Sequence, residues 1–148
     1  MFGQTTTNTD DMGIGQILED AFGNFDFVSP MLYPSHYING FIGYKNPAQY
    51  PYEVVKYSMD GAKNKKEIFA NKDAEPEETP AKNLKMEMFE VKLAKFRPWL
   101  QDFNMGANYT AKMVKEEIKA VQDSLGTEYN GFMLWNSNNV YTKGAVVK

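Results

Sequence analysis

Three short segments hold the side chains of this sequence that could bind or transform a small polar ligand. They are residues 33–37 (YPSHY), 99–103 (WLQDF) and 135–139 (WNSNN). Together they contain both tryptophans and the only histidine, and the only arginine, Arg97, stands two residues before Trp99. Flat aromatic rings offer apolar faces, while His, Gln, Asp and Asn offer hydrogen bonds in both directions. This combination suits a polar, ring-shaped ligand such as a sugar.

Each of the three segments lies at or just after the end of a run that predicts a buried strand, over residues 25–33, 96–103 and 131–135. The first run, FDFVSPMLY, is apolar at both alternating positions, which predicts burial on both faces, as in a parallel sheet. Helical spacing of apolar residues predicts helices over residues 14–22, 51–71 and about 111–125. Asn108 or Thr110 could cap the last of these helices, and Gly126 ends it.

Alternating strands and helices predict an α/β fold with a parallel sheet and right-handed crossovers. The carboxyl ends of parallel strands meet at one edge, where ligands bind. The three segments are therefore expected to converge on one face.

The chain of 148 residues fits a single domain over residues 1–148. Residues 34–51 predict a long loop, rich in Gly, Pro, Asn and Tyr, of the kind that often carries function. Residues 72–82 carry acids and prolines and predict a solvated insertion or linker. The pattern over residues 83–95 leaves helix and strand as alternatives.

Composition excludes several classes of protein. A net charge of −3, with 16 basic and 19 acidic residues, does not fit a nucleic-acid binder that depends on a basic surface. The absence of cysteine excludes disulfides, and the single histidine excludes a multi-histidine metal site, so neither a metal nor a cofactor is predicted. No apolar run is long enough to span a membrane, and the first residues, MFGQTTTNTDD, lack the features of a signal peptide.

Several motifs occur here in the order typical of one bacterial family. YPSHY, RPWLQDF and GFMLWNSNNVYT, together with FDFVSPMLY and YPYEVV, resemble the C-terminal half of the putative glycoside hydrolase family, formerly a domain of unknown function. The resemblance covers most of the chain apart from about residues 63–95. It implies a (β/α)8 TIM-type barrel, of which this chain would supply about strands five to eight. The strand ends also resemble chitinase-type barrels, in which Trp135 would be the floor of a sugar subsite and Tyr33 a wall.

The resemblance implies a carbohydrate-active protein, a glycoside hydrolase when the barrel is complete, whose strand-end loops line a cleft for an oligosaccharide or polysaccharide. Asp102 is the candidate catalytic acid; a loop cap or a partner for Arg97 is its alternative role. Asp10 and Asp11 could reach the same face or could cap the following turn. The main acid would belong to the other half of the barrel, so this chain alone is expected to be inactive. The predicted substrate-binding residues are Tyr33, His36, Tyr37, Arg97, Trp99, Gln101, Trp135 and Asn136.

Two other functions stay open at this point. The chain could be a non-catalytic carbohydrate-binding module, or a non-functional truncated remnant. Half a barrel exposes unpaired sheet edges, which predicts aggregation or self-association. Relatives suggest an exported or envelope-associated protein, but the sequence leaves the compartment open, as it does the glycan, its linkage and the stereochemistry of hydrolysis.

Overall fold

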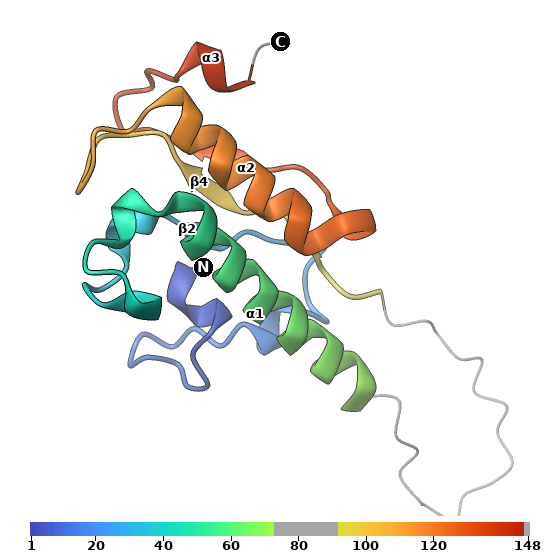
Figure 1. Ribbon diagram of the computed structural model, residues 1–148. Coiled ribbons are helices and arrows are strands. Elements are labelled where there is room, and N and C mark those ends of the chain that lie inside the picture. Colours follow the sequence, from blue (N-terminus) through green and yellow to red (C-terminus); the bar gives the residue numbers. More distant parts are fainter. Residues whose placement is uncertain (73–91, 147–148) are drawn as a thin grey trace, which may run out of the picture.

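Two long helices lie side by side across one face of a small parallel sheet (Figure 1). They are α1 (Pro51–Lys72) and α2 (Ala111–Leu125). The structure is a computed structural model that describes residues 1–72 and 92–146. The predicted acidic insertion, apart from Lys72, and most of the undecided segment over residues 83–95 lie outside the described residues.

The strand pairs found within residues 1–72 and 92–146 are all parallel, which confirms the predicted α/β class. The strands are β1 (Phe27–Val28), β2 (Met31–Leu32), β3 (Lys95–Phe96), β4 (Trp99–Gln101) and β5 (Met133–Trp135). β1 pairs with β3, and β4 lies between β2 and β5. Phe2 adds a single parallel bridge to Met31, so the first residues of the chain extend the edge of the sheet.

A proline interrupts each of the two longer predicted strands. Residues 25–33 become β1 and β2 on either side of Pro30, and residues 96–103 become β3 and β4 around Pro98. Proline has no N–H to donate to a neighbouring strand. Its carbonyl still accepts: Trp99 N donates to Pro30 O at 2.9 Å, and Met133 N donates to Pro98 O at 2.9 Å. Each proline thus still takes part in the parallel pairing, through its carbonyl group.

The helix predicted over residues 14–22 is wrong. The segment forms turns and one short 3-10 helix, η2 (Glu19–Ala21). Met12, Gly13 and Gly15 have φ angles of 57°, 69° and 68°, in the left-handed region that an α-helix cannot contain. The periodic apolar residues Leu18 and Phe22 are nevertheless fully buried. The pattern therefore identified core residues but not the backbone that carries them.

The other two helices agree with the sequence. α1 begins at Pro51, where proline suits a first turn. Thr110 caps α2, because its Oγ1 accepts a hydrogen bond from Met113 N at 3.4 Å, and the chain leaves the helix at Gly126 with φ 53°. A short C-terminal helix, α3 (Lys143–Val146), was not predicted. Short 3-10 helices complete the connections: η1 (Gly3–Thr6), η3 (Pro34–His36), η4 (Phe41–Gly43), η5 (Pro47–Gln49) and η6 (Gly126–Glu128).

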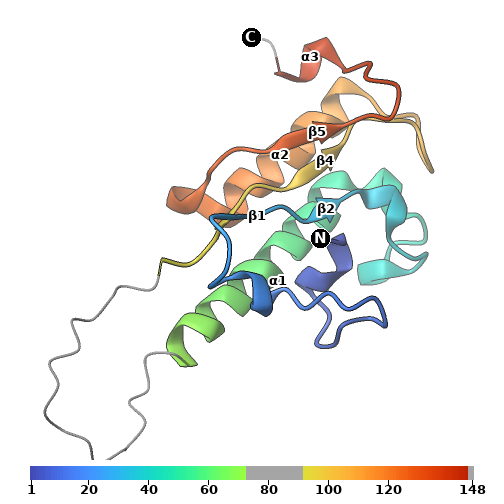
Figure 2. The ribbon, with the colours of Figure 1, turned by 180° about the vertical axis from the view of Figure 1, so that it is seen from behind.

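The core lies between the sheet and the two helices. Successive strand residues point to opposite faces of a sheet. Those that face the helices join one buried cluster with residues of α1 and α2: Val28, Leu32, Phe96 and Leu100. Their neighbours in the strands form the opposite face, which we call the bare face: Phe27, Met31, Lys95, Trp99, Gln101, Met133 and Trp135. Figure 2 shows the strands in front of α1 and α2, with neither helix on the near side.

Within residues 1–72 and 92–146, none of the helices combines the length and the apolar character that a membrane span requires.

Candidate functional site

The two tryptophans meet on the bare face. Trp99 is the first residue of β4 and Trp135 the last of β5, and their ring centroids lie 6.1 Å apart with the planes at 88°. Trp135 is 45% exposed, whereas Trp99 is half-buried. The end of β5 therefore presents a flat aromatic surface to solvent beside a second ring that fixes its orientation.

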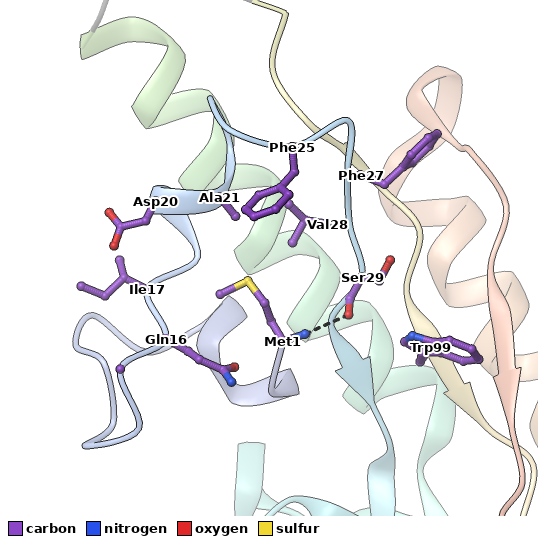
Figure 3. Close-up of a pocket in the computed structure, with 11 residues that line it drawn as sticks. Met1, Gln16, Ile17, Asp20, Ala21, Phe25, Phe27, Val28, Ser29 and Trp99 are labelled. Carbon is purple, nitrogen blue, oxygen red and sulfur yellow. Dashed lines mark hydrogen bonds between the residues drawn. The ribbon is translucent and has the colours of Figure 1, made fainter.

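A cleft of ≈ 460 Å³ runs along the bare face from Trp99 toward the turns before β1 (Figure 3). Phe25, Phe27 and Ile17 give it an apolar lining, and Asp20 and Ser29 add polar groups. Among the predicted site residues it contains only Trp99. The cleft lies beside β1 and the beginning of β4, away from the carboxyl ends of the strands. The bare face and the strand-end loops are thus two adjoining surfaces joined by the tryptophan pair.

Aromatic side chains gather where the chain leaves β2 and β4. The ring of Tyr33 packs edge to face against the rings of His36 and Phe103. The centroid distances are 5.2 Å to His36 and 5.7 Å to Phe103. Tyr33 is 4% exposed, and burial, with the Glu117 carboxyl nearby, raises its pKa to about 12. His36 is exposed at the rim, and partial burial lowers its pKa. A lowered pKa keeps the imidazole neutral at pH 7, able both to donate and to accept a hydrogen bond.

Two predicted ligand-binding residues use their polar groups inside the protein. Gln101 is fully buried: its Oε1 accepts from Ser35 N at 3.1 Å, and its Nε2 donates to Phe103 O at 2.9 Å. The Tyr37 hydroxyl is also buried and lies 2.8 Å from Ser58 Oγ on α1. Gln101 therefore joins the two strand-end loops, and Tyr37 fastens the first of them to α1.

Asp102 and Asn136 hold the loop after β5. The carboxylate of Asp102, in a residue 3% exposed, accepts from Thr142 N at 2.7 Å and from Thr142 Oγ1 at 2.6 Å. The Asn136 amide donates to Asp102 O and to Val140 O and accepts from Asn138 N. Both Asp102 oxygens are thus engaged by Thr142. The arrangement fixes the loop that follows Trp135, and a catalytic role for Asp102 stays a prediction.

Arg97 lies at the opposite end of the strands from Trp135. Its Nε donates to Asn130 O at 3.0 Å, and its guanidinium stands 4.0 Å from the centroid of the Phe27 ring. The ion pair with Asp102 considered from the sequence is not among the interactions of the described residues. The structure therefore separates Arg97 from the strand-end loops.

Sequence reasoning missed a buried polar pair beneath β4. Glu117 of α2 is fully buried and accepts hydrogen bonds from the Tyr109 hydroxyl and from Gln101 N, the latter at 3.0 Å. Burial raises the pKa of Glu117 well above its ordinary value, although both hydrogen bonds oppose the shift. Burial and the neighbouring Glu117 also raise the pKa of Tyr109. Glu117 lies three residues after Val114 and four before Val121, and both valines belong to the apolar stripe of the helix. A carboxyl group at a stripe position could have indicated a buried polar residue.

Aromatic rings thus gather at one edge of a parallel sheet, on loops held by buried polar contacts. A search of curated proteins and a search of solved structures found no match to this chain. A family model described as "Putative glycosyl hydrolase domain" matches residues 1–141, which is nearly the whole sequence. The chain therefore belongs to that family of glycosyl hydrolase domains.

Proposed function

We propose that this chain binds a glycan at the carboxyl edge of its sheet, with Trp135 as the floor of a sugar subsite. The observation that supports this most directly is that the side chain of Trp135, the last residue of β5, is 45% exposed. An apolar ring held against Trp99 offers its face to the C–H groups of a sugar, and such a contact gains from apolar burial. Membership of a glycosyl hydrolase family supports a carbohydrate as the ligand.

Apart from Arg97, the remaining predicted residues either contact the glycan or hold the loops of the subsite in place. Tyr33 and His36 form the wall of the subsite, with His36 at the exposed rim. Gln101, Asn136 and Tyr37 hold the loops in place through their internal hydrogen bonds. The proposed role of Asp102 is the same kind of support, because Thr142 occupies both of its carboxylate oxygens.

The proposed fold of the active protein is a (β/α)8 barrel to which this chain contributes about strands five to eight. The bare face supports this proposal, because a barrel strand has helices on one side and packed side chains on the other. Phe27 and Trp135 are 40% and 45% exposed on that face. Further strands would cover it and would bring the main catalytic acid to the glycan. A second copy of the chain is the alternative cover, by self-association through the sheet edges.

Binding by the chain itself tests the proposed function. Affinity electrophoresis through gels that contain cellulose derivatives, xylan, chitosan or pectin identifies a polysaccharide that retards the protein. Titration with the corresponding hexasaccharide then gives the affinity. Replacing Trp135 by alanine is expected to weaken binding about tenfold, which corresponds to roughly 1.4 kcal/mol. Tyr57→Ala, which removes an aromatic residue 50% exposed on α1, is the matched control and should leave binding unchanged.

A non-catalytic binding module is the second candidate, and the engaged carboxylate of Asp102 favours it for the chain alone. It predicts that the chain binds the hexasaccharide without releasing reducing ends. Release of reducing ends by this chain, lost in Asp102→Asn, would restore the catalytic role. If no polysaccharide retards the protein and Trp135→Ala changes nothing, the proposed function is wrong.

A further inference from the structure

A separate cleft lies between the loop after β2 and the loop after β4. Its volume is ≈ 530 Å³, and it is lined by Asn39, Lys45, Asn46, Gln49, Tyr50 and Gly106. Both loops leave the carboxyl ends of their strands, and both views of the molecule place them on the same side (Figures 1 and 2). The cleft shares no lining residue with the one beside Trp99.

The two loops pack closely against each other at the base of this cleft. The Asn46 amide donates to Gly106 O at 2.8 Å, and its Oδ1 accepts from Ala48 N at 3.2 Å. Gly106 has φ 69°, and a Cβ at this position would lie 2.9 Å from the Cβ of Ala48. Only glycine therefore allows the two loops to approach this closely. The base of the cleft is consequently an ordered surface.

One wall of the cleft is the ring of Tyr50, which stacks on Tyr44. The ring centroids of Tyr44 and Tyr50 lie 3.9 Å apart, and the planes differ by 17°. Tyr50 lines the cleft and remains 39% exposed. Stacking fixes the plane of the Tyr50 ring before any ligand arrives, which lowers the entropy lost on binding.

Three polar side chains of the cleft have no partner among the described residues, whereas Asn46 is engaged at its base. Asn39, Lys45 and Gln49 are exposed, and none of the three makes a side-chain hydrogen bond or ion pair with another residue of the described parts of the chain. Two amides offer donors and acceptors, and the ammonium offers donors. Their hydrogen-bonding capacity is available to a ligand with several hydroxyl groups.

A neighbouring cleft shows the contrast. It shares Gln49 and Tyr50 but is otherwise lined by residues of the first turn of α1 and by residues of α2. Three of its charged groups are paired: Lys112 with Glu116 at 3.6 Å, and Lys119 with Asp123. The Tyr52 hydroxyl also donates to Asp123, at 2.8 Å. The two clefts thus share Gln49 and the Tyr50 ring, and they differ in the other polar groups: Asn39 and Lys45 belong to the Asn39–Tyr50 cleft alone and make no side-chain contact of this kind with the described residues.

We propose that the cleft between Asn39, Tyr50 and Gly106 is a second saccharide subsite, which binds a sugar ring of the same glycan chain, or of a second chain, apart from the Trp135 subsite. An ordered aromatic ring and free amides are the groups that recognise a pyranose. The identity of the ligand as a saccharide rests on the proposed function. The location of the subsite rests on the cleft itself.

Amide NMR of the full chain, titrated with the hexasaccharide chosen by affinity electrophoresis, tests this inference. We expect shifts in the backbone and side-chain amide signals of Asn39 and Gln49, in addition to the indole N–H of Trp135. Tyr50→Ala should weaken binding at this cleft about fivefold, so that the Asn39 and Gln49 shifts reach their midpoint at about fivefold higher ligand concentration. Gln49→Ala, which removes an exposed amide and leaves the tyrosine stack in place, should weaken it less. Tyr57→Ala is the matched control.

The two proposals fail in different ways. Shifts at Trp135 alone would overturn the second subsite and leave the proposed function standing. Shifts at Asn39 and Gln49 alone would support the second subsite and overturn the role of Trp135. Shifts at neither place would overturn both. An unchanged midpoint of the Asn39 and Gln49 shifts in a folded Tyr50→Ala variant would also contradict the second subsite.

Discussion

The two faces of the sheet are built from neighbouring residues of the same strands, yet their surroundings differ completely. On the helix-covered face, Leu32 and Leu100 are fully buried and Phe96 is 2% exposed. On the bare face, Phe27 is 40% exposed and Trp135 45%. Both faces are mainly apolar, with Lys95 and Gln101 as the polar positions of the bare face. The covered face shows what a completed interior looks like in this protein, and the bare face shows a surface of similar composition that lacks a covering layer.

The polar groups follow the same division. Beneath the covered side of β4, Glu117 satisfies Gln101 N and the Tyr109 hydroxyl inside the protein. In the loop cleft, Asn39 and Gln49 keep their amides free of the described residues. Side chains whose hydrogen bonds are complete stabilise the fold, and those whose bonds remain open are available for a ligand.

The largest expected effect is the difference in free energy of unfolding between the same substitution made on the covered face and on the bare face. Phe96 packs on Phe22 with ring centroids 5.9 Å apart, so Phe96→Ala should leave a cavity and lower the free energy of unfolding by about 4 kcal/mol. Phe27→Ala should cost less than about 1 kcal/mol, because it removes an exposed ring and its contact with Arg97. Urea denaturation measures both. Equal losses would show that the bare face is already packed.

Glu117 should make stability depend on pH. Its pKa is raised in the folded protein, so above the ordinary carboxyl pKa the unfolded chain releases a proton that the folded chain keeps. The free energy of unfolding should therefore fall as pH rises from the ordinary pKa toward the raised one. Glu117→Gln should remove this fall in urea titrations between pH 4 and 8. Glu116→Gln, next to it on α2, should retain it; the same slope in both variants would contradict the assignment.

A smaller and more local effect is expected at the loop after Trp135. Asp102→Asn replaces a charged acceptor of the Thr142 N–H by a neutral one, which should cost about 1 kcal/mol. Hydrogen exchange at the Thr142 amide should accelerate by roughly fivefold, since that amide loses protection directly. Asp20→Asn, at an exposed position, is the control. Unchanged exchange at Thr142 would remove the supporting role given to Asp102.

A substitution on the bare face is expected to have the smallest effect on stability. The same substitution is expected to have the clearest effect on association between copies of the chain. Phe27→Gln should change the free energy of unfolding by less than about 1 kcal/mol. If copies of the chain cover each other through this face, the same substitution should lower the dimer fraction in sedimentation velocity at matched concentration. Tyr57→Gln on α1 is the control. A dimer that persists in the Phe27 variant would locate its interface elsewhere.

The sequence predicted the helices α1 and α2, the parallel order of the strands and the gathering of aromatic residues at strand ends. These features depend on local signals: Pro51 and Thr110 at helix beginnings, apolar spacing, and alternation of strand and helix. It failed over residues 14–22, where apolar spacing was helical but Gly15, like Met12 and Gly13 just before the segment, took a left-handed angle. The spacing of core residues does not report the backbone angles between them.

What each candidate site residue does was decided by tertiary structure. Residue types and spacing indicated that Tyr37, Gln101 and Asp102 were chemically capable. They could not show that Ser58, Ser35 and Thr142 would take up their hydrogen bonds, since these partners lie 21, 66 and 40 residues away along the chain. The sequence by itself determined which side chains stand at strand ends. The packing of distant segments determined which of them stay exposed, because exposure depends on what covers a residue and not on the residue itself.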